Sequence, residues 1–521
     1  MYRQSRTVRA TFAWPAGVLL IAFACGVSVH PAAAQVLYGS VIGTVSDPSG
    51  AVVPSASITL TSKQTGVSRT SVSDDAGRYS VVNVLPGKYD IKVTAPGFRT
   101  YTQLDLDVSP NTVGRVDVKM EVGQVSEQVT VEASAATLQT DKADTHSEIE
   151  SKAITSMPLS GYRNYQTLIN LVPGATPAQF QNSITDTPGR ALQTHINGGN
   201  AQTNITRIDG ATSVNVWLPH HVGYVEPEEA IEVVNVTTTA ADAEQGMAGS
   251  SAITLVTKSG TNDFHGSAYE FHDDQHLKAR NFFQAPGTAK ALSIYNNFGA
   301  TAGGAIKKDK LFYFVSYDGT RQRTGGPGFY TVPNAALKAG DFSGISTVLY
   351  DPQTGNPDGT GRLPFQNNQI PGNRISPIAQ QLQSYYPDVN TTGPSPYVND
   401  YFASGGPILS RNYLESKINY NVNDKEQVWG KYGRMWATSG GQGVFGIAGG
   451  PGLPGSDPGL GDTLIQVGTI GHSHTFSPNL ILDGVIGYER QGQHVTGNDY
   501  GTNYGLQFGI HRAAAAQPDR F

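Results

Sequence analysis

Seven stretches in the second half of the chain are joined by connections that alternate between long and short. The stretches lie near residues 264–273, 296–306, 311–320, 411–421, 426–436, 463–475 and 480–490. The connections are long at 274–295, 321–410 and 437–462, and short at 307–310, 421–425 and 476–479. This spacing predicts antiparallel strands whose tight turns gather at one end and whose long loops gather at the other.

The third stretch, KLFYFVSYDGTR (310–321), shows what such strands face. One side carries Leu311, Tyr313, Val315 and Tyr317, and the other carries Phe312, Phe314, Ser316 and Asp318. We expect the first side to touch lipid and Asp318 to face a wet lumen, with the lysine-rich turn before the strand in the periplasm. A soluble β-sandwich is the alternative, but it leaves the alternating connection lengths unexplained.

The composition favours β structure and argues against nucleic acid as a partner. Charged residues make up 15% of the 521 residues, and the chain contains 60 Gly and 24 Tyr. Its formal net charge of −6 gives no basic face of the kind that nucleic acids require. Beyond the N-terminus, no run of 18 apolar residues predicts a transmembrane helix.

The first 34 residues are typical of a secretory signal. Arg3, Arg6 and Arg9 precede the apolar run VLLIAFA (18–24), and small residues at a following A-x-A site predict cleavage between Ala34 and Gln35. An uncleaved anchor and a lipoprotein signal at Cys25 are the alternatives. Cys25 is the only cysteine, so the mature chain has neither disulfides nor a cysteine-based metal site.

Residues 38–121 read as seven short strands separated by Gly, Pro and Asp turns, which predicts a β-sandwich. Residues 122–140 read as a polar linker, and 141–262 as an α+β domain. In the latter, Pro173-Gly174 ends a helical stretch, and strands follow in TNITRIDGAT (203–212), around IEVVNVTTT and in SAITLVT. Residues 263–521 then hold the seven long-spaced strands.

Two groups of motifs resemble known families. The first group resembles the carboxypeptidase-regulatory-like domain and consists of GTVSDPSGAVVPSASITLT and DDAGRYSVVNVLPGKYDIKVTAPGF. This family is a transthyretin-like β-sandwich, often classed as carbohydrate-binding-like, that serves as an accessory domain and is not catalytic. The second group of motifs resembles the TonB-dependent outer-membrane receptors of the Oar-like branch. Its members are PLSGYRNYQTLINLVPG, INGGNAQTNITRIDGATS and NNFGATAGGAIKKDKLFYFVSYDG. Tyr162 departs from the more usual S-G-R-N pattern, which leaves one local turn in doubt.

The resemblance implies a mainly β receptor of the Gram-negative outer membrane, with residues 141–262 as a plug inside a barrel of about 22 strands. It also implies a periplasmic N-terminal domain, a TonB-type energy-coupling protein as partner, contact with outer-membrane lipid and the barrel-assembly machinery, and uptake of a large carbohydrate or peptide-like nutrient. By position and β-branched composition, the candidate TonB box is Glu127, Gln128, Val129, Thr130 and Val131. A last sandwich strand or a plain linker is the alternative for this segment.

The ligand-facing loop of the family follows the Asp209-Gly210 turn. The candidate ligand-binding residues are therefore Trp217, His220, His221 and Tyr224. Their side chains offer stacking faces and hydrogen-bond donors. Packing of these side chains against the barrel wall is the alternative.

Nothing in the sequence indicates an enzyme or a cofactor. None of the 12 His residues has Glu three positions later, and the chain lacks H-E-x-x-H, G-x-S-x-G and phosphate-loop motifs. His472 and His474 share one face of an expected strand, yet we predict no metal site.

Two further expectations concern the whole chain. A secreted adhesin or structural carbohydrate-binding protein of β domains is the alternative function, although it would not need a plug.

Seven strands are also an odd number and too few to surround such a plug, so we expect the chain to be a C-terminally truncated receptor.

Overall fold

The computed structural model describes residues 37–123, 128–132, 141–159, 163–180, 184, 187–215, 221–241, 245–246, 248–280, 290–394, 397–450, 459–477 and 480–510. The signal segment, with its cleavage site between Ala34 and Gln35, lies outside these residues. Within the described part of the chain, no helix combines the length and the hydropathy needed to cross a membrane.

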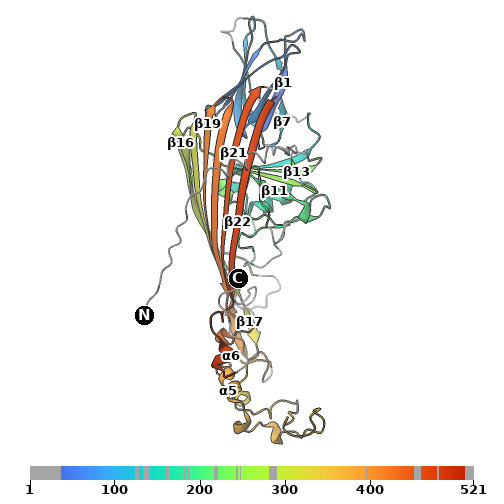
Figure 1. Cartoon of the computed structure of the whole chain (residues 1–521), viewed down its shortest axis with the longest axis vertical. Helices are drawn as coiled ribbons and strands as arrows, with labels where there is room; N and C mark the ends of the chain where they lie inside the picture. The colour runs from blue at the N-terminus through green and yellow to red at the C-terminus, as the bar shows by residue number, and fades with distance from the viewer. Residues whose placement is uncertain are drawn as a thin grey trace, which may run out of the picture.

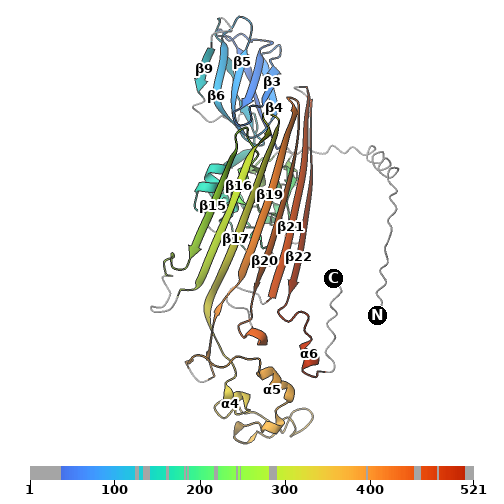
Figure 2. The same ribbon diagram turned by 90° about the vertical axis from the view of Figure 1, so that its left-hand side faces the viewer.

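The N-terminal domain consists of two small sheets (Figures 1 and 2). One contains β1 (Gly39–Ser46), β4 (Arg78–Val84), β7 (Val113–Arg115) and β8 (Val118–Lys119). The other has the order β3 (Ser68–Val72), β2 (Ser57–Ser62), β5 (Gly87–Thr94), β6 (Thr100–Val108) and β9 (Gln128–Glu132). Alternate residues of both sheets, among them Val41, Leu60 and Ile91, share one buried core, as the alternating sequence pattern predicts.

Strand β9 matches the alternative of a last sandwich strand for the segment that contains the candidate TonB box. It pairs in parallel with β6, from Thr100 opposite Gln128 to Leu104 opposite Glu132. The segment therefore extends the second sheet of the N-terminal domain as its edge strand. The sequence left this alternative open, because a five-residue β-prone segment carries no information about its partner.

The inner domain, residues 141–259, contains a five-stranded mixed sheet. Its order is β10 (Thr145–Glu150), β13 (Ile231–Thr239), β14 (Ala252–Thr257), β11 (Ile205–Ile208) and β12 (Ala211–Thr212). Short helices accompany it: α2 (Ser151–Ser156), η1 (Tyr165–Leu171), η2 (Ala201–Thr203) and η3 (Glu228–Ala230). The predicted helical stretch before Pro173 is present as the 3₁₀-helix η1, which the side chain of Asn164 caps by accepting a hydrogen bond from the Gln166 backbone N–H.

The long-strand sheet contains all seven strands expected after residue 263. Its order is β15 (His265–Asp274), β16 (Leu292–Lys307), β17 (Leu311–Tyr330), β19 (Ile408–Asn423), β20 (Glu426–Gly441), β21 (Gly459–Ser477) and β22 (Leu480–Thr496). An additional short strand, β18 (Tyr401–Gly405), pairs with the end of β17. All neighbours are antiparallel, and β15 and β22 form the two edges of the sheet.

The tight turns and the long connections lie at opposite ends of this sheet (Figure 2). The N-terminal domain lies at the tight-turn end, where Asn262 contacts both Thr65 and Asp309. The long connections contain α4 (Ala335–Lys338), η5 (Gln366–Asn368), η6 (Gly372–Arg374), α5 (Pro377–Gln383) and η7 (Gly446–Ala448), and α6 (Tyr504–Gln507) follows β22.

The two faces of the long-strand sheet have opposite character. Residues Phe312, Phe314, Ser316 and Asp318 of β17 are buried against the interior, as expected. Outward-facing Ile470 and Ile486 are 64% and 79% exposed. An exposed apolar face opposite a buried face with polar groups is the pattern of a lipid-facing strand.

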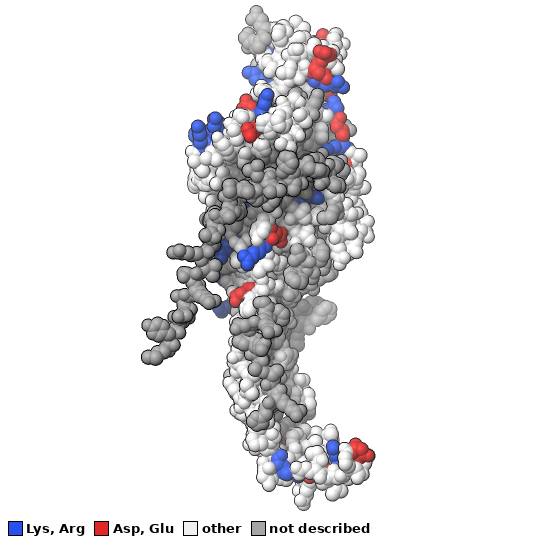
Figure 3. Space-filling view, in the orientation of Figure 1, with Lys and Arg blue, Asp and Glu red and all other residues white. Residues whose placement is uncertain are grey.

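The wet surroundings expected for Asp318 are wrong. This carboxylate is buried, and it accepts hydrogen bonds from the Tyr269 hydroxyl at 2.9 Å and the Asn297 side chain at 2.7 Å. On the side shown in Figure 3, charged side chains gather over the N-terminal domain.

Candidate functional site

The inner domain lies against the buried face of the long-strand sheet, and the two share one core (Figure 1). This core joins inner-domain residues such as Ile169 and Val234 to Tyr413, Met435 and Ile465 of the long strands. Side chains of sequentially distant segments therefore meet at this contact, which forms the candidate site.

The turn between β11 and β12 places one carboxylate at the centre of the contact. Asp209 and Gly210 both have positive φ, at 47° and 81°, which a tight Asp-Gly hairpin turn requires. The Asp209 carboxylate accepts hydrogen bonds from the backbone N–H of Thr257 at 3.0 Å and from its hydroxyl. The turn thus fixes the carboxylate toward β19 and β20.

A buried group of five charged side chains, which we call the charge cluster, joins the two parts. It consists of Asp209 and Glu226 of the inner domain and of Glu415, Lys417 and Lys431 of the long strands. The Lys417 ammonium lies 2.8 Å from the Asp209 carboxylate, and Lys431 lies 4.0 Å from Asp209 and contacts Glu226. Burial removes water screening, so each charge depends on its protein partners.

The electrostatics of the two inner-domain carboxyl groups differ. Burial alone would raise the pKa of Asp209, but the ammonium groups of Lys417 and Lys431 outweigh it and hold this pKa below its usual range. Burial and the neighbouring Glu415 raise the pKa of Glu226 well above its usual range, although Lys431 opposes them. Three carboxyl groups thus face two ammonium groups in the cluster.

The contacts of Tyr224 match the alternative that this side chain packs against the barrel wall. Its side chain is fully buried, and its hydroxyl donates a hydrogen bond to Glu415 at 2.9 Å. Its ring meets that of Tyr413 edge-on at 5.5 Å and lies over Gly433, where a Cβ atom would come within about 3 Å of the ring. Tyr224 is therefore a contact between the inner domain and the sheet.

The other candidates of this loop divide into two groups. His221 is described and buried, and it lines an internal cavity with Gln166 and Thr206. Trp217 and His220 lie outside the described residues. Their ligand-binding role stays a prediction.

A larger cleft separates the inner domain from the sheet on the side of β15. It has a volume of about 740 Å³ and is lined by Thr155, Pro158, Arg163, Phe271, Tyr295 and Gln322, among others. The Arg163 guanidinium lies 3.5 Å from the centre of the Phe271 ring. The lining also includes Asp273 and Lys278, so aromatic rings, hydroxyls and one amide share the cleft with charged groups.

Neither the charge cluster nor the cleft was predicted from the sequence. Lys417 and Lys431 alternate with apolar residues on their strands, and this is the only signal that they point inward. Their partner Asp209 is recognisable as a turn residue, but the pairing across 208 positions is not.

The comparisons with known proteins agree with this geometry. A model of the outer membrane beta barrel domain matches residues 256–520, just over half of the chain. The chain belongs to the outer-membrane β-barrel family. A model of the carboxypeptidase regulatory-like domain matches residues 40–121, as predicted.

This outer-membrane β-barrel protein is also similar to the TonB-dependent transporter Oar of Myxococcus xanthus, with 27% identity over 310 residues. The match covers 55% of the chain but spans only 28% of the length of that relative. Together with the two matched domains, it supports the prediction of a TonB-dependent receptor-like protein in the outer membrane.

Two solved structures are similar at lower levels. The ferric enterobactin receptor PfeA of Pseudomonas aeruginosa, a mutant in complex with enterobactin, is 12% identical, with a TM-score of 0.38 and coverage of 66% of this chain and 41% of that one. The siderophore receptor PirA of the same organism is 12% identical, with a TM-score of 0.36 and coverage of 68% and 42%. These TM-scores carry no inference about the substrate of this chain.

Glu228 gives the contact a testable pH dependence. Burial and the neighbouring Asp318 raise its pKa to about 8, although Arg163 and Arg411 oppose the shift. The folded chain thus keeps a proton up to about pH 8 that the unfolded chain loses near its ordinary pKa of about 4.3. The stability that this proton contributes is complete below the lower pKa and is lost as pH rises toward 8.

We therefore expect Glu228→Gln to flatten the decline of stability between pH 6 and 8, which in the wild type should approach about 1.4 kcal/mol per pH unit. Urea midpoints of the full chain in detergent micelles measure this slope, with the exposed Glu121→Gln as control. An equal slope in wild type and Glu228→Gln would contradict the assignment.

Proposed function

We propose that the chain acts in energy-coupled uptake across the outer membrane, with the inner domain as the plug and the long-strand sheet as part of a barrel wall. The observation that carries this proposal is the charge cluster together with the shared core, since both attach the inner domain to the face opposite the lipid-facing side chains. Strands β15 and β22 are the edges where further wall strands would pair, because hydrocarbon does not tolerate unpaired backbone groups.

The N-terminal domain is then periplasmic, because it lies at the tight-turn end of the sheet (Figure 2). Short turns of such barrels face the periplasm and long loops face outside. Arg69 of this domain donates to Gln427 at 3.2 Å, and Asn83 donates to Ser473 at 2.7 Å. These contacts support a domain that docks on the periplasmic rim.

The TonB-type partner would bind at β9. This strand contains Gln128, Val129, Thr130 and Val131 of the candidate box, while Glu127 lies outside the described residues. Because β9 ends the order β3-β2-β5-β6-β9, no strand among the described residues pairs with its edge away from β6, and that edge can accept an added strand. Strand addition at such an edge is a common mode of peptide recognition.

The substrate class that fits is a carbohydrate or peptide-like nutrient, bound by the long loops and passed along the cleft beside Arg163 and Phe271. The aromatic rings, hydroxyls and charged groups of the cleft can stack on such a solute and hydrogen-bond to it, which supports this class. Outer-membrane lipid would contact the apolar outer face, and the barrel-assembly machinery would insert the complete wall.

Growth of a deletion strain on single carbon and nitrogen sources tests the proposal, with iron chelates tested in parallel. We expect a defect on one polysaccharide or peptide source, and complementation should restore growth. A defect confined to iron chelates would contradict the nutrient class.

A further inference from the structure

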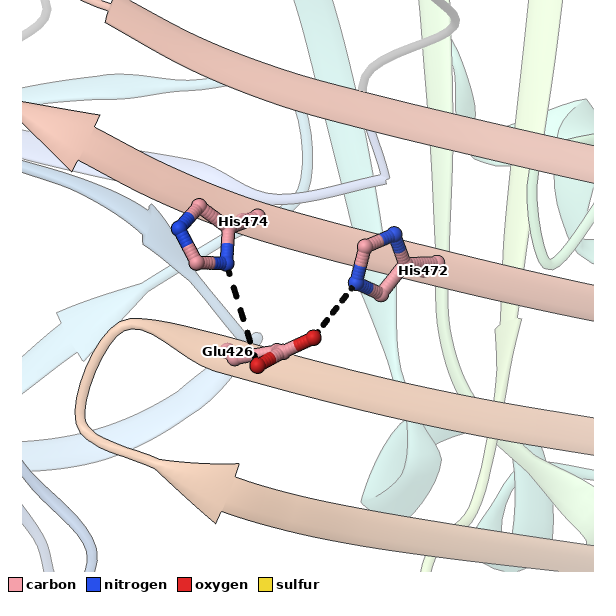
Figure 4. A group of neighbouring side chains, drawn as sticks. All are labelled: Glu426, His472 and His474. Carbon is pink, nitrogen blue, oxygen red and sulfur yellow. Dashed lines mark hydrogen bonds and ion pairs between the residues drawn. The ribbon is translucent and has the colours of Figure 1, made fainter.

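Three side chains of types that can ligate metals come together on the outer face of the long-strand sheet, opposite the face that carries the charge cluster. Glu426 is the first residue of β20, and His472 and His474 lie two residues apart on β21 (Figure 4). Glu426 is directly opposite His474 in the strand register, and Val428 is opposite His472. Cross-strand neighbours on one face are about 5 Å apart at Cβ, so all three side chains can reach a common point.

The donor atoms are already close. His472 Nε2 lies 3.1 Å from one oxygen of Glu426, and His474 Nδ1 lies 3.9 Å from the other. All three donor positions fall within 4.8 Å of one another. Metal–ligand bonds of about 2.0–2.2 Å place tetrahedral ligands about 3.4 Å apart, so small side-chain rotations suffice to close the set.

The position of the group leaves its three side chains accessible from outside the sheet. The intervening residues Gln427 and Ser473 face inward and are buried, so the three ligands point outward. Their side chains are 28% to 42% exposed, and Phe476, 55% exposed, packs against the His474 ring at 4.4 Å. The group thus borders the apolar outer face at its tight-turn end and is partly exposed.

We propose that Glu426, His472 and His474 bind a divalent transition-metal ion of the Zn²⁺ class. Two imidazoles and one carboxylate are a ligand set that Zn²⁺ accepts, with the fourth position left to water or to a group from outside. Ca²⁺ and Mg²⁺ are disfavoured because they require mainly oxygen ligands. The assignment depends on this local geometry and not on the transport proposal.

The ion would join two adjacent hairpins at the tight-turn end. Glu426 belongs to the β19–β20 hairpin, and the histidines belong to β21, which pairs with β22. On the opposite face of the same two strands, Gln427 and Ser473 bind Arg69 and Asn83 of the N-terminal domain. A bound ion would therefore stiffen the rim on which that domain docks.

Titration of the full chain with Zn²⁺ in detergent micelles tests the site, using protein purified without a histidine tag. We expect one ion per chain, bound at micromolar concentration or tighter. His472→Ala and His474→Ala should each weaken binding at least about 100-fold, because even the loss of a residue that only hydrogen-bonds to a metal ligand costs about 10–100-fold. X-ray absorption of the loaded protein should show two nitrogen ligands and oxygen near 2.0–2.2 Å.

The matched control is the double variant His272→Ala/His494→Ala, which removes two histidines elsewhere on the long strands and should leave affinity unchanged. Circular dichroism verifies that each variant folds. Wild-type protein that fails to bind Zn²⁺, or equal binding by the His472→Ala and control variants, would overturn the proposal and leave the three side chains as an ion pair only.

Discussion

Replacing Lys417 by methionine should destabilise the folded chain by about 3–5 kcal/mol, because it leaves the Asp209 carboxylate buried without its closest cation. The remaining cation, Lys431, lies at 4.0 Å from Asp209 and already contacts Glu226. Urea unfolding in detergent micelles measures the loss, followed by circular dichroism and by tryptophan fluorescence. Trp429 is a suitable reporter because its ring lies 5.4 Å from the Lys417 ammonium.

The double variant Lys417→Met/Asp209→Asn separates a lost ion pair from a damaged core. Removing both charges leaves no uncompensated carboxylate, so the double variant should recover part of the loss. Lys88→Met removes a lysine from an exposed pair with Asp107 and should change little. A double variant less stable than Lys417→Met would show that methionine packing, and not charge, causes the effect.

Replacing Val129 and Val131 by proline should reduce uptake to the level of a strain without the energy-coupling protein. Proline removes a backbone N–H donor and constrains the chain, so β9 could no longer accept an added strand. Radiolabelled uptake of the substrate found in the growth screen measures this effect, and surface binding of the same substrate should persist.

Val72→Pro is the matched control for this pair. Val72 ends β3, the opposite edge strand of the same sheet, and its side chain is 58% exposed. It therefore tests whether any proline at an edge of this sheet disturbs the domain. Uptake that falls equally in Val72→Pro, or that survives in the Val129/Val131 variant, would contradict a coupling role for β9.

The sequence predicted the strands well because each strand of the long sheet separates lipid from a buried interior. That division imposes a period of two, visible where Phe312 and Phe314 alternate with Tyr313 and Val315. The tight turns were predictable for the same reason, since they must leave the membrane. The regulatory-like domain was predictable from its turn motifs, and a family model confirms it.

The sites were less predictable because they depend on contacts across long separations. Tyr224 is of a residue type that often binds ligands, but Gly433 leaves room for its ring and Glu415 accepts a hydrogen bond from its hydroxyl. Likewise, His472 and His474 were visible as a pair on one face, whereas their third partner, Glu426, is 46 residues away from His472. Strand register supplies such partners, and a single sequence does not fix it.

Disulfide cross-linking in cells tests most directly whether this receptor-like protein is energy-coupled through β9. Single cysteines replace Thr130 on β9 or Thr70 on β3, both exposed, in a Cys25→Ala background, and the TonB-type protein carries cysteines along its C-terminal domain. We predict a cross-linked product with Thr130→Cys and none with Thr70→Cys. Equal products from both positions, or a product from Thr70→Cys alone, would contradict coupling through β9.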